Sequence, residues 1–307
     1  MFRLFWKQRY IQLFALAGIA FIIVFNFIPM FGIIISFKDY RLSSGIKGMF
    51  TSRWVGLRYF IEFFTDYNSA AIIRNTIVMS VTKLLFTFPL PILLALTLNE
   101  IKSPLFKRFV QTASYLPYFI SWVIVAGFCQ IFLQANGVIN SLLMAIGVTE
   151  SNIAFYVTPK YFLPMVIITS IWKDTGWWAI LFLASIATID PTLYEAASMD
   201  GVGRLKRIWY ITLPSIQGTI TVVLIIALGN LLGGGLSGSN FEQGWLLGTP
   251  GNAEVSEILQ TYIMKIGLSR ARYSYAAAMG FIQSVISLLL ILASNYGAKK
   301  ISGDGLF

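Results

Sequence analysis

The sequence predicts an all-α integral membrane protein, with six transmembrane helices and a short helix in one cytoplasmic loop. Three observations support this fold class. Of the 307 residues, 57% are hydrophobic and 12% are charged, whereas a soluble domain carries about 25% charged residues. Six apolar segments are long enough to cross a bilayer, which requires about 20 residues in a helix. One polar segment, residues 190–213, lies between two of these spans and carries the capping residues of a short helix.

The first three predicted spans have different flanks. The apolar run 11–36 follows a basic segment, but it is too long for the core of a signal peptide and has no small-residue cleavage site. We therefore predict a retained helix. The second span, 74–98, contains Lys83, and the third, 109–133, carries no charge. Lys83 can line a cavity or pair within the helix bundle, and the sequence does not decide between the two.

The last three predicted spans flank the polar loop and close the chain. The fourth span, 161–189, contains two charges and three tryptophans. The fifth, 214–236, ends in three consecutive glycines, which are either a flexible loop or the hinge of a gate. The sixth, 273–296, precedes two lysines. Together the spans predict one transmembrane domain over residues 1–307.

Basic residues near the ends of the spans orient the chain, because they collect on the cytoplasmic side of a membrane. Six spans place both termini on one face, and four basic groups share it, so we predict that both termini are cytoplasmic. The first outer loop is also basic, which conflicts with the rule, but the rule is most reliable for short loops and this loop is longer. The four cytoplasmic groups are Arg3, Lys7 and Arg9; Lys102, Lys107 and Arg108; Arg204, Lys206 and Arg207; and Lys299 and Lys300.

The composition of the chain excludes several kinds of catalytic and metal-binding site. There is no histidine, which removes catalytic triads that need histidine and most zinc sites. The single cysteine, Cys129, can form neither an intrachain disulfide nor a cysteine metal cluster. The formal charge of +10 is better explained by basic loops on anionic lipid than by nucleic acid. We predict no catalytic residue, no metal site and no nucleic-acid partner.

The polar segment 190–213 reads as a short capped helix followed by an amphipathic piece. Asp190 and Pro191 suit the N-cap and first position of a helix. Gly201 suits the left-handed residue that ends it. Small residues on this helix permit close approach of another protein, and Glu195 offers one anion to a partner arginine. The alternative is an ordinary interfacial helix between two spans.

The residues Glu195-Ala196-Ala197, Asp200-Gly201, Ile211 and Leu213-Pro214 resemble, without a gap, the EAA motif of membrane subunits of binding-protein-dependent ABC importers. In that family the short helix is the coupling helix, which seats in the ATPase subunit and transmits its closure. The resemblance implies the type I ABC importer permease fold. It also implies that the ATPase-coupling residues are Glu195, Ala196, Ala197, Asp200 and Gly201.

Further motifs look like the LplB-like branch of sugar permeases, which import oligosaccharides and polysaccharide breakdown products, alginate among them. They include Phe25 to Gly32, Phe37 to Tyr40, Trp54 to Leu57, Leu98 to Glu100, Tyr115 to Val123 and Tyr275 to Ala278. The resemblance implies a multi-pass protein of the bacterial cytoplasmic membrane. It implies these partners: a second, homologous permease subunit, two ATPase subunits that carry ATP and Mg, and an extracytoplasmic solute-binding protein.

The fourth span carries the candidate wall of a sugar pathway. Charges inside a span usually face a water-filled cavity or a partner. Lys173 can stack on Trp177, and Asp174 lies near Trp178, each four residues on. The alternative is the outer membrane interface, where Trp and Lys are ordinary. Similarity to the maltose permease favours the pathway, and the candidate substrate-binding residues are Trp172, Lys173, Asp174, Trp177 and Asn230.

Three other functions are alternatives to an oligosaccharide import permease. The same architecture can carry a non-sugar solute. A secondary transporter should show an inverted repeat and often a midplane ion site, and neither is visible. A membrane-embedded enzyme should show converging acids, bases or a metal cluster, and the sequence has very few acids within its spans.

Overall fold

The structure, a computed structural model, describes residues 9–302, and over this range it contains helices and one isolated antiparallel bridge, Lys38 to Trp54, but no strand. The prediction of an all-α protein is confirmed. Arg3 and Lys7, which helped to orient the chain, lie outside the described residues. Internal contacts divide the chain into two compact units, residues 1–69 with 262–283, and residues 70–261 with 284–307. The assignment of residues 1–307 to one transport domain stays a prediction.

The first unit begins with a helical stretch, Arg9–Phe37, that is long and apolar enough to cross a membrane. Its side chains are almost all exposed within this chain, as expected of a helix that faces lipid or another subunit. Pro29 has no backbone N–H to give to the preceding turn, and a π-helical turn lies just before it. The stretch consists of α2 (Arg9–Ile22), a π turn (Ile23–Phe27), α3 (Ile28–Met30) and a 3-10 turn (Phe31–Phe37).

The remainder of the first unit is held together by aromatic rings. Phe37, Phe60 and Phe281 form a triangle with ring centroids 5.3 to 6.0 Å apart. Tyr59 and Tyr275 meet edge to face at 6.4 Å. These rings join the loop after the first span to the start of the last long helix. The elements are a 3-10 turn (Leu42–Ser44), α4 (Gly45–Thr51), α5 (Arg58–Thr65), a π turn (Lys265–Ser269) and the first part of α19 (Tyr273–Ser302).

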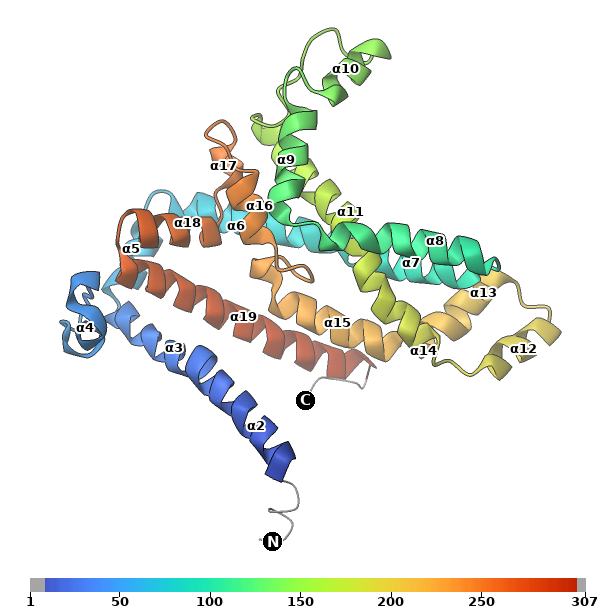
Figure 1. Cartoon of the computed structure of the whole chain (residues 1–307), viewed down its shortest axis with the longest axis horizontal. Helices are drawn as coiled ribbons and strands as arrows, with labels where there is room; N and C mark the ends of the chain where they lie inside the picture. Colours follow the sequence, from blue (N-terminus) through green and yellow to red (C-terminus); the bar gives the residue numbers. More distant parts are fainter. Residues whose placement is uncertain (1–8, 303–307) are drawn as a thin grey trace. The chain divides into compact units, whose positions relative to one another are not determined.

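The second unit is arranged around α11 (Pro159–Ile186), which packs against α7, α8, α15 and α17 (Figure 1). The same unit contains the short polar helix of interest, α12 (Pro191–Met199). Its other helices are α6 (Ser69–Thr87), α7 (Pro89–Glu100), α8 (Pro104–Tyr115), α9 (Trp122–Leu133), α10 (Val138–Ala145), α13 (Arg204–Arg207), α14 (Leu213–Ser215), α15 (Gln217–Gly229), α16 (Asn240–Leu246), α17 (Ala253–Ser256), α18 (Leu259–Met264, which runs across the unit boundary) and the rest of α19. Short turns link them: Leu116–Phe119 and Leu231–Gly233 are 3-10, and Ile208–Thr212 is π-helical.

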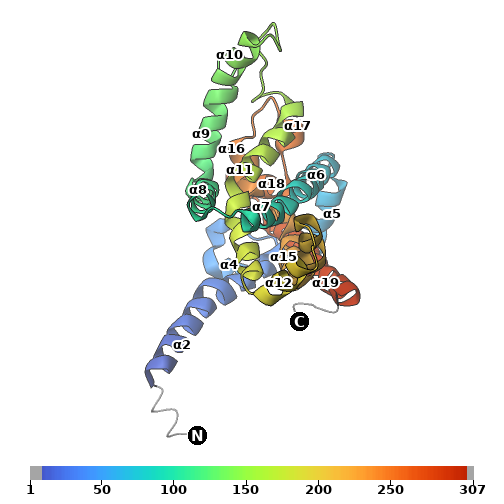
Figure 2. The ribbon, with the colours of Figure 1, turned by 90° about the vertical axis from the view of Figure 1, so that its right-hand side faces the viewer.

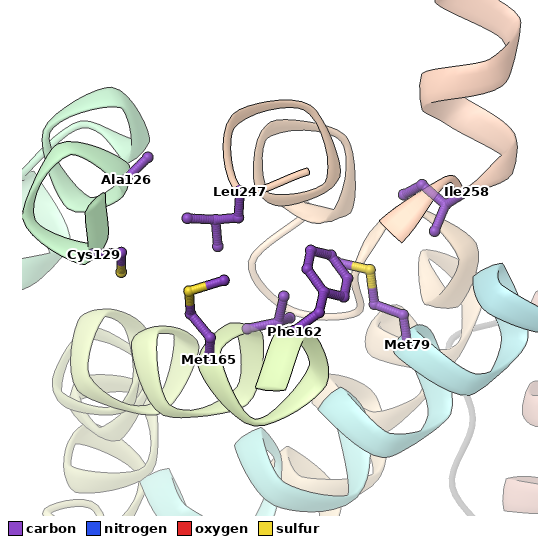
Figure 3. Packing of buried hydrophobic residues seen from close by; sticks show 8 residues of the cluster. Met79, Ala126, Cys129, Phe162, Met165, Leu247 and Ile258 are labelled. Atoms are coloured by element: carbon purple, nitrogen blue, oxygen red, sulfur yellow. The ribbon is translucent and has the colours of Figure 1, made fainter. Parts of the chain in front are cut away.

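Two apolar clusters fix α11 in the second unit. Figure 3 shows the first, in which Phe162 and Met165 of α11 face Met79 of α6 and Cys129 of α9. The second cluster lies nearer the other end of α11, around Phe182, and includes residues of α7 and α15. Burial of such side chains contributes about 1.5 to 3 kcal/mol each in water. Here the two clusters mainly position α11, because close packing of their side chains leaves the helix one arrangement against its neighbours.

The helices agree with four of the predicted spans in place, and differ at the third and the fifth. The described residues contain five helices long and apolar enough to cross a membrane, or six if one bent pair counts as a span. The helix expected over 109–133 is interrupted, because Pro117 opens a 3-10 turn and Ser121 caps a new helix through the amide of Ile124. The corresponding candidate span is Trp122–Ala145.

The fifth span also differs from its expected bounds of 214–236. It is the bent pair, Arg204–Ser215 and Gln217–Gly229, with an angle of 63° between its halves. Its first half begins ten residues before Pro214, and α15 ends at Gly229. The chain then turns through Gly234 and Gly235, whose φ angles of 114° and 64° lie in the left-handed region that favours glycine.

Candidate functional site

The short polar helix, α12, is capped at both ends as the sequence predicts. The Asp190 carboxylate accepts a hydrogen bond from the amide of Thr192 at 2.9 Å. This bond favours the charged form, so it holds the pKa of Asp190 below its ordinary value. At the other end Gly201 has φ of 69°. The Val202 amide donates to the carbonyl of Ala197 at 2.9 Å, which closes the glycine-terminated end of the helix.

Two side-chain contacts tie α12 to the segment that follows it. The hydroxyl groups of Tyr194 and Thr212 lie 3.0 Å apart. Arg207 donates to the Ser198 hydroxyl at 2.9 Å. Ala197 of α12 is itself buried. The two contacts link both turns of α12 to the chain leading into α15.

The opposite face of α12 is exposed and carries a single unpaired carboxylate. Within the described part of the chain, Glu195 has neither a hydrogen bond nor an ion pair. Ala196 beside it is exposed, and Met199 is 90% exposed. In Figure 1 the chain loops out from the end of α11 through α12 and returns along α13. This face can therefore receive another protein with an apolar contact and a cationic partner for Glu195.

Lys173 and Asp174 lie near the middle of α11, and both are buried. The expected stacking of Lys173 on Trp177 is wrong. The Lys173 ammonium instead donates to the carbonyl oxygen of Tyr118 and lies 5.0 Å from the Tyr118 ring centroid and 5.7 Å from that of Trp122. Trp177 stacks on Tyr118 with ring centroids 4.4 Å apart. Tertiary packing thus replaces a partner on the same helix with residues of the interrupted third span.

One carboxylate oxygen of Asp174 belongs to a group of polar atoms without a hydrogen-bond partner among the described residues. Its Oδ2 atom, the Thr175 hydroxyl and the Trp178 indole nitrogen are all buried without a hydrogen bond to any described residue. Native proteins satisfy most buried polar groups, so a cluster of exceptions points to a function outside ordinary packing. One acceptor, one hydroxyl and one N–H donor within five residues match the hydrogen-bonding needs of a polyhydroxy compound.

The other two candidate substrate residues lie in different settings. Trp172 is 46% exposed and does not belong to the buried group around Asp174. Asn230 caps the C-terminal end of α15, and its side-chain amide donates to the carbonyl of Gly235 at 3.0 Å. Asn230 therefore shapes the glycine turn after the fifth span. Its proposed contact with substrate stays a prediction.

Lys83, which the sequence left open, is completely buried in a polar network. Its ammonium donates to Ser239 and Gln243 at 2.7 Å each, and to Asn240 at 3.3 Å. The side-chain nitrogen of Gln243 donates to the hydroxyl of Ser170 in α11 at 2.9 Å, which extends the network to that helix. Three neutral acceptors surround one buried cation, so Lys83 fastens α6 to α16 and, through Gln243, to α11.

Two contributors to this region were missed by the sequence reasoning. The sequence shows Tyr118 only as part of a family motif, whereas in the structure it contacts both Lys173 and Trp177. The sequence predicts no role for Gly176, whereas a Cβ there would lie 2.0 Å from the Ser114 carbonyl oxygen of α8. A glycine beside two charges in a span is a signal of close backbone approach, but the partner is more than 60 residues away in sequence.

Comparison with known proteins gives a consistent set of relatives. Residues 87–303 match the family described as "Binding-protein-dependent transport system inner membrane component". Protein LplB of Bacillus subtilis (strain 168) is 42% identical over 302 residues, which cover 98% of this chain and 92% of LplB. The polygalacturonan/rhamnogalacturonan transport system permease protein YteP of the same strain is 41% identical, with coverage of 98% and 91%.

Solved structures extend the similarity to three dimensions. A chain of a bacterial ABC transporter involved in the import of the acidic polysaccharide alginate superposes with a TM-score of 0.88 at 36% identity. The match covers 98% of this chain and 99% of the other. A second structure, the bacterial alginate ABC transporter in complex with an alginate pentasaccharide-bound periplasmic protein, gives the same score and identity, with coverage of 100% and 99%.

Proposed function

Because the chain belongs to the family of binding-protein-dependent transport system inner membrane components, we propose that it is the permease subunit of an ATP-driven importer of oligosaccharides. The fold is that of the type I ABC importer permease. The single observation that carries the proposal is α12. A helix capped by Asp190 and Gly201 is tied to the fifth span on one face and presents an unpaired Glu195 on the other.

The proposed power source lies on another chain. The sequence contains no G-x-x-x-x-G-K-[ST] phosphate-binding loop, so two ATPase subunits would bring ATP and Mg. Glu195 and the small residues beside it would seat in the ATPase. A second, homologous permease would complete the pathway, and an extracytoplasmic solute-binding protein would deliver the sugar. The assembly belongs in the bacterial cytoplasmic membrane, surrounded by lipid, with both termini of this chain in the cytoplasm.

Closure of the ATPase would move α12, and its contacts pass the movement on. Tyr194 is bonded to Thr212 and Ser198 to Arg207, both in the segment leading into the bent fifth span. The Arg204 side chain also lies 3.9 Å from Glu100 at the end of α7. A push on α12 thus reaches two helices that pack on α11. We propose that this movement drives a rigid-body exchange between inward-open and outward-open states.

The buried region of α11 and the names of the relatives support the proposal that the transported substrate is an oligosaccharide. YteP is named for polygalacturonan and rhamnogalacturonan, and the solved relatives import alginate. The partnerless polar atoms of Asp174, Thr175 and Trp178 suit sugar hydroxyls, and stacked aromatic rings lie beside them. We propose that Lys173, Trp177 and Tyr118 hold this wall in shape. Trp172 and Asn230 stay candidates for direct contact.

The proposal is tested by reconstituted transport. The permease is purified together with its partner permease and ATPase, placed in proteoliposomes with ATP inside, and supplied with the sugar-loaded binding protein outside. The expected result is accumulation of labelled oligosaccharide only when ATP and the binding protein are both present. Uptake that continues without ATP, or a permease that never associates with an ATPase, would refute the assignment.

A further inference from the structure

The first unit contains a polar cavity of about 370 Å³ that the proposed transport mechanism does not use. Its size lies within the range of small-ligand sites, about 300 to 1,000 Å³. It is formed by the loop after the first span and by the start of α19, on the face that the topology prediction makes the outer one. The lining residues that matter to the argument are Asp39, Arg41, Arg58, Tyr59, Arg272 and Tyr273.

Guanidinium groups exceed carboxylates in the lining by three to one. The guanidinium of Arg272 already has two partners: it forms an ion pair with Glu62 at 2.6 Å and lies 4.4 Å from the Tyr275 ring centroid. Arg58 lies against the Tyr59 ring at 5.9 Å. Arg41 is exposed, and within the described residues it has no side-chain hydrogen bond, ion pair or ring contact. One full positive charge in the lining of the cavity therefore has no partner among the residues that the structure describes.

The lining of the cavity also contains tyrosines, and hydrogen bonds hold its segments together. The Tyr59 hydroxyl donates to Asp39 at 2.9 Å, so the one carboxylate of the lining is already engaged. Burial, and then Asp39, raise the pKa of Tyr59, which keeps this hydroxyl a neutral donor. The Tyr40 amide donates to the Ser274 hydroxyl at 3.0 Å, which joins the loop to the first turn of α19. Tyr40 and Tyr273 are also among the residues that line the cavity.

We propose that this cavity binds the carboxylate-bearing ring of an acidic, uronate-containing oligosaccharide at the outer face of the permease. The inference rests on the proposed function and names the class of its substrate. A free guanidinium fits a carboxylate with two parallel hydrogen bonds, and tyrosine rings suit the C–H faces of a pyranose. A neutral sugar would leave Arg41 unpaired. An acidic side chain of a protein would need the arginine but not a ring-sized cavity walled by tyrosines.

The test measures binding directly, in the purified transporter complex held in nanodiscs of zwitterionic lipid. The probes are trigalacturonate and its carboxyl-reduced, neutral counterpart, titrated by calorimetry without ATP. Arg41→Gln is the test variant. Arg53→Gln is its matched control, because Arg53 is an exposed arginine of the same loop that does not line the cavity. Neither substitution removes a side-chain hydrogen bond, ion pair or ring contact within the described chain, so both variants should fold.

The expected result is that Arg41→Gln raises the Kd for trigalacturonate about tenfold, the worth of one charge-assisted pair, while Arg53→Gln changes it less than about twofold by simple charge loss at an exposed site. The neutral trimer should bind weakly to every variant. Equal affinity of the wild type for both trimers, or equal effects of the two substitutions, would overturn the inference. ATP-driven uptake of a neutral oligosaccharide would persist in that case, so the proposed function would survive its failure.

Discussion

Lys83 of α6 donates a hydrogen bond to the side-chain oxygen of Gln243 in α16 at 2.7 Å, and Gln243 donates in turn to Ser170 of α11 at 2.9 Å. The side-chain amide of Gln243 thus accepts a hydrogen bond from a buried cation and donates one to a third helix. Neither Lys83 nor Gln243 is accessible to solvent. Gln243 therefore links these three helices through hydrogen bonds of its own side chain.

Gln243→Leu should therefore destabilise the permease strongly. It removes one acceptor from a buried ammonium group and leaves Ser170 without its donor, and each unsatisfied buried group costs about 1 to 3 kcal/mol, more for a charge. Thermal unfolding in detergent measures the effect. Gln130→Leu is the control, because Gln130 is exposed on α9 and its side chain has no hydrogen bond to any described residue. Equal melting temperatures for the two variants would contradict the role of the network.

Glu195→Gln should lower ATP-driven uptake about tenfold, the factor that one lost charge-assisted pair is worth. The permease should still insert and fold, because Glu195 has no partner within the described chain. Uptake by proteoliposomes and co-purification of the ATPase measure the effect. Glu150→Gln, an exposed change in the loop after α10, is the control. Wild-type uptake by Glu195→Gln would remove this residue from the proposed interface.

Gly201→Ala should impair coupling through the backbone alone. A Cβ at this position meets nothing within 4 Å, but φ is 69°, where an L-residue is strained by about 1 to 2 kcal/mol. The end of α12 should shift, and uptake should fall. Gly203→Ala is a closely matched control, since its Cβ also meets nothing while φ is −67°. If both variants transport equally well, the left-handed turn is not needed for coupling.

Gly176→Ala should disturb the wall of the proposed sugar pathway. Its Cβ would lie 2.0 Å from the backbone oxygen of Ser114, which cannot rotate away as a side chain can. The strain of overpacking is about 1 to 3 kcal/mol or more, and relief requires α8 and α11 to separate. Oligosaccharide uptake and melting temperature should both fall. Gly127→Ala on α9, where a Cβ meets nothing within 4 Å, should leave both unchanged; a shared loss would point to a general effect of alanine.

Local features of the chain were predictable from sequence because their partners are near in sequence. The cap at Asp190 reaches two residues, and the left-handed turn at Gly201 is set by its own backbone. The apolar runs gave the spans by length, since a bilayer accepts little else. The third span was wrong in its bounds, because its lack of charge concealed the break that Pro117 and Ser121 make.

The sequence by itself determined that this is a helical membrane protein of an importer family, with a short polar helix capped at both ends between two of its spans. Only the tertiary structure decided which groups the buried charges face. Lys173 meets Tyr118, 55 positions away, rather than Trp177, and Lys83 meets residues 156 to 160 positions away. The physical reason is that a buried charge takes its partners from whichever helix packing brings near. Local periodicity tells which face a residue occupies but not what lies opposite it.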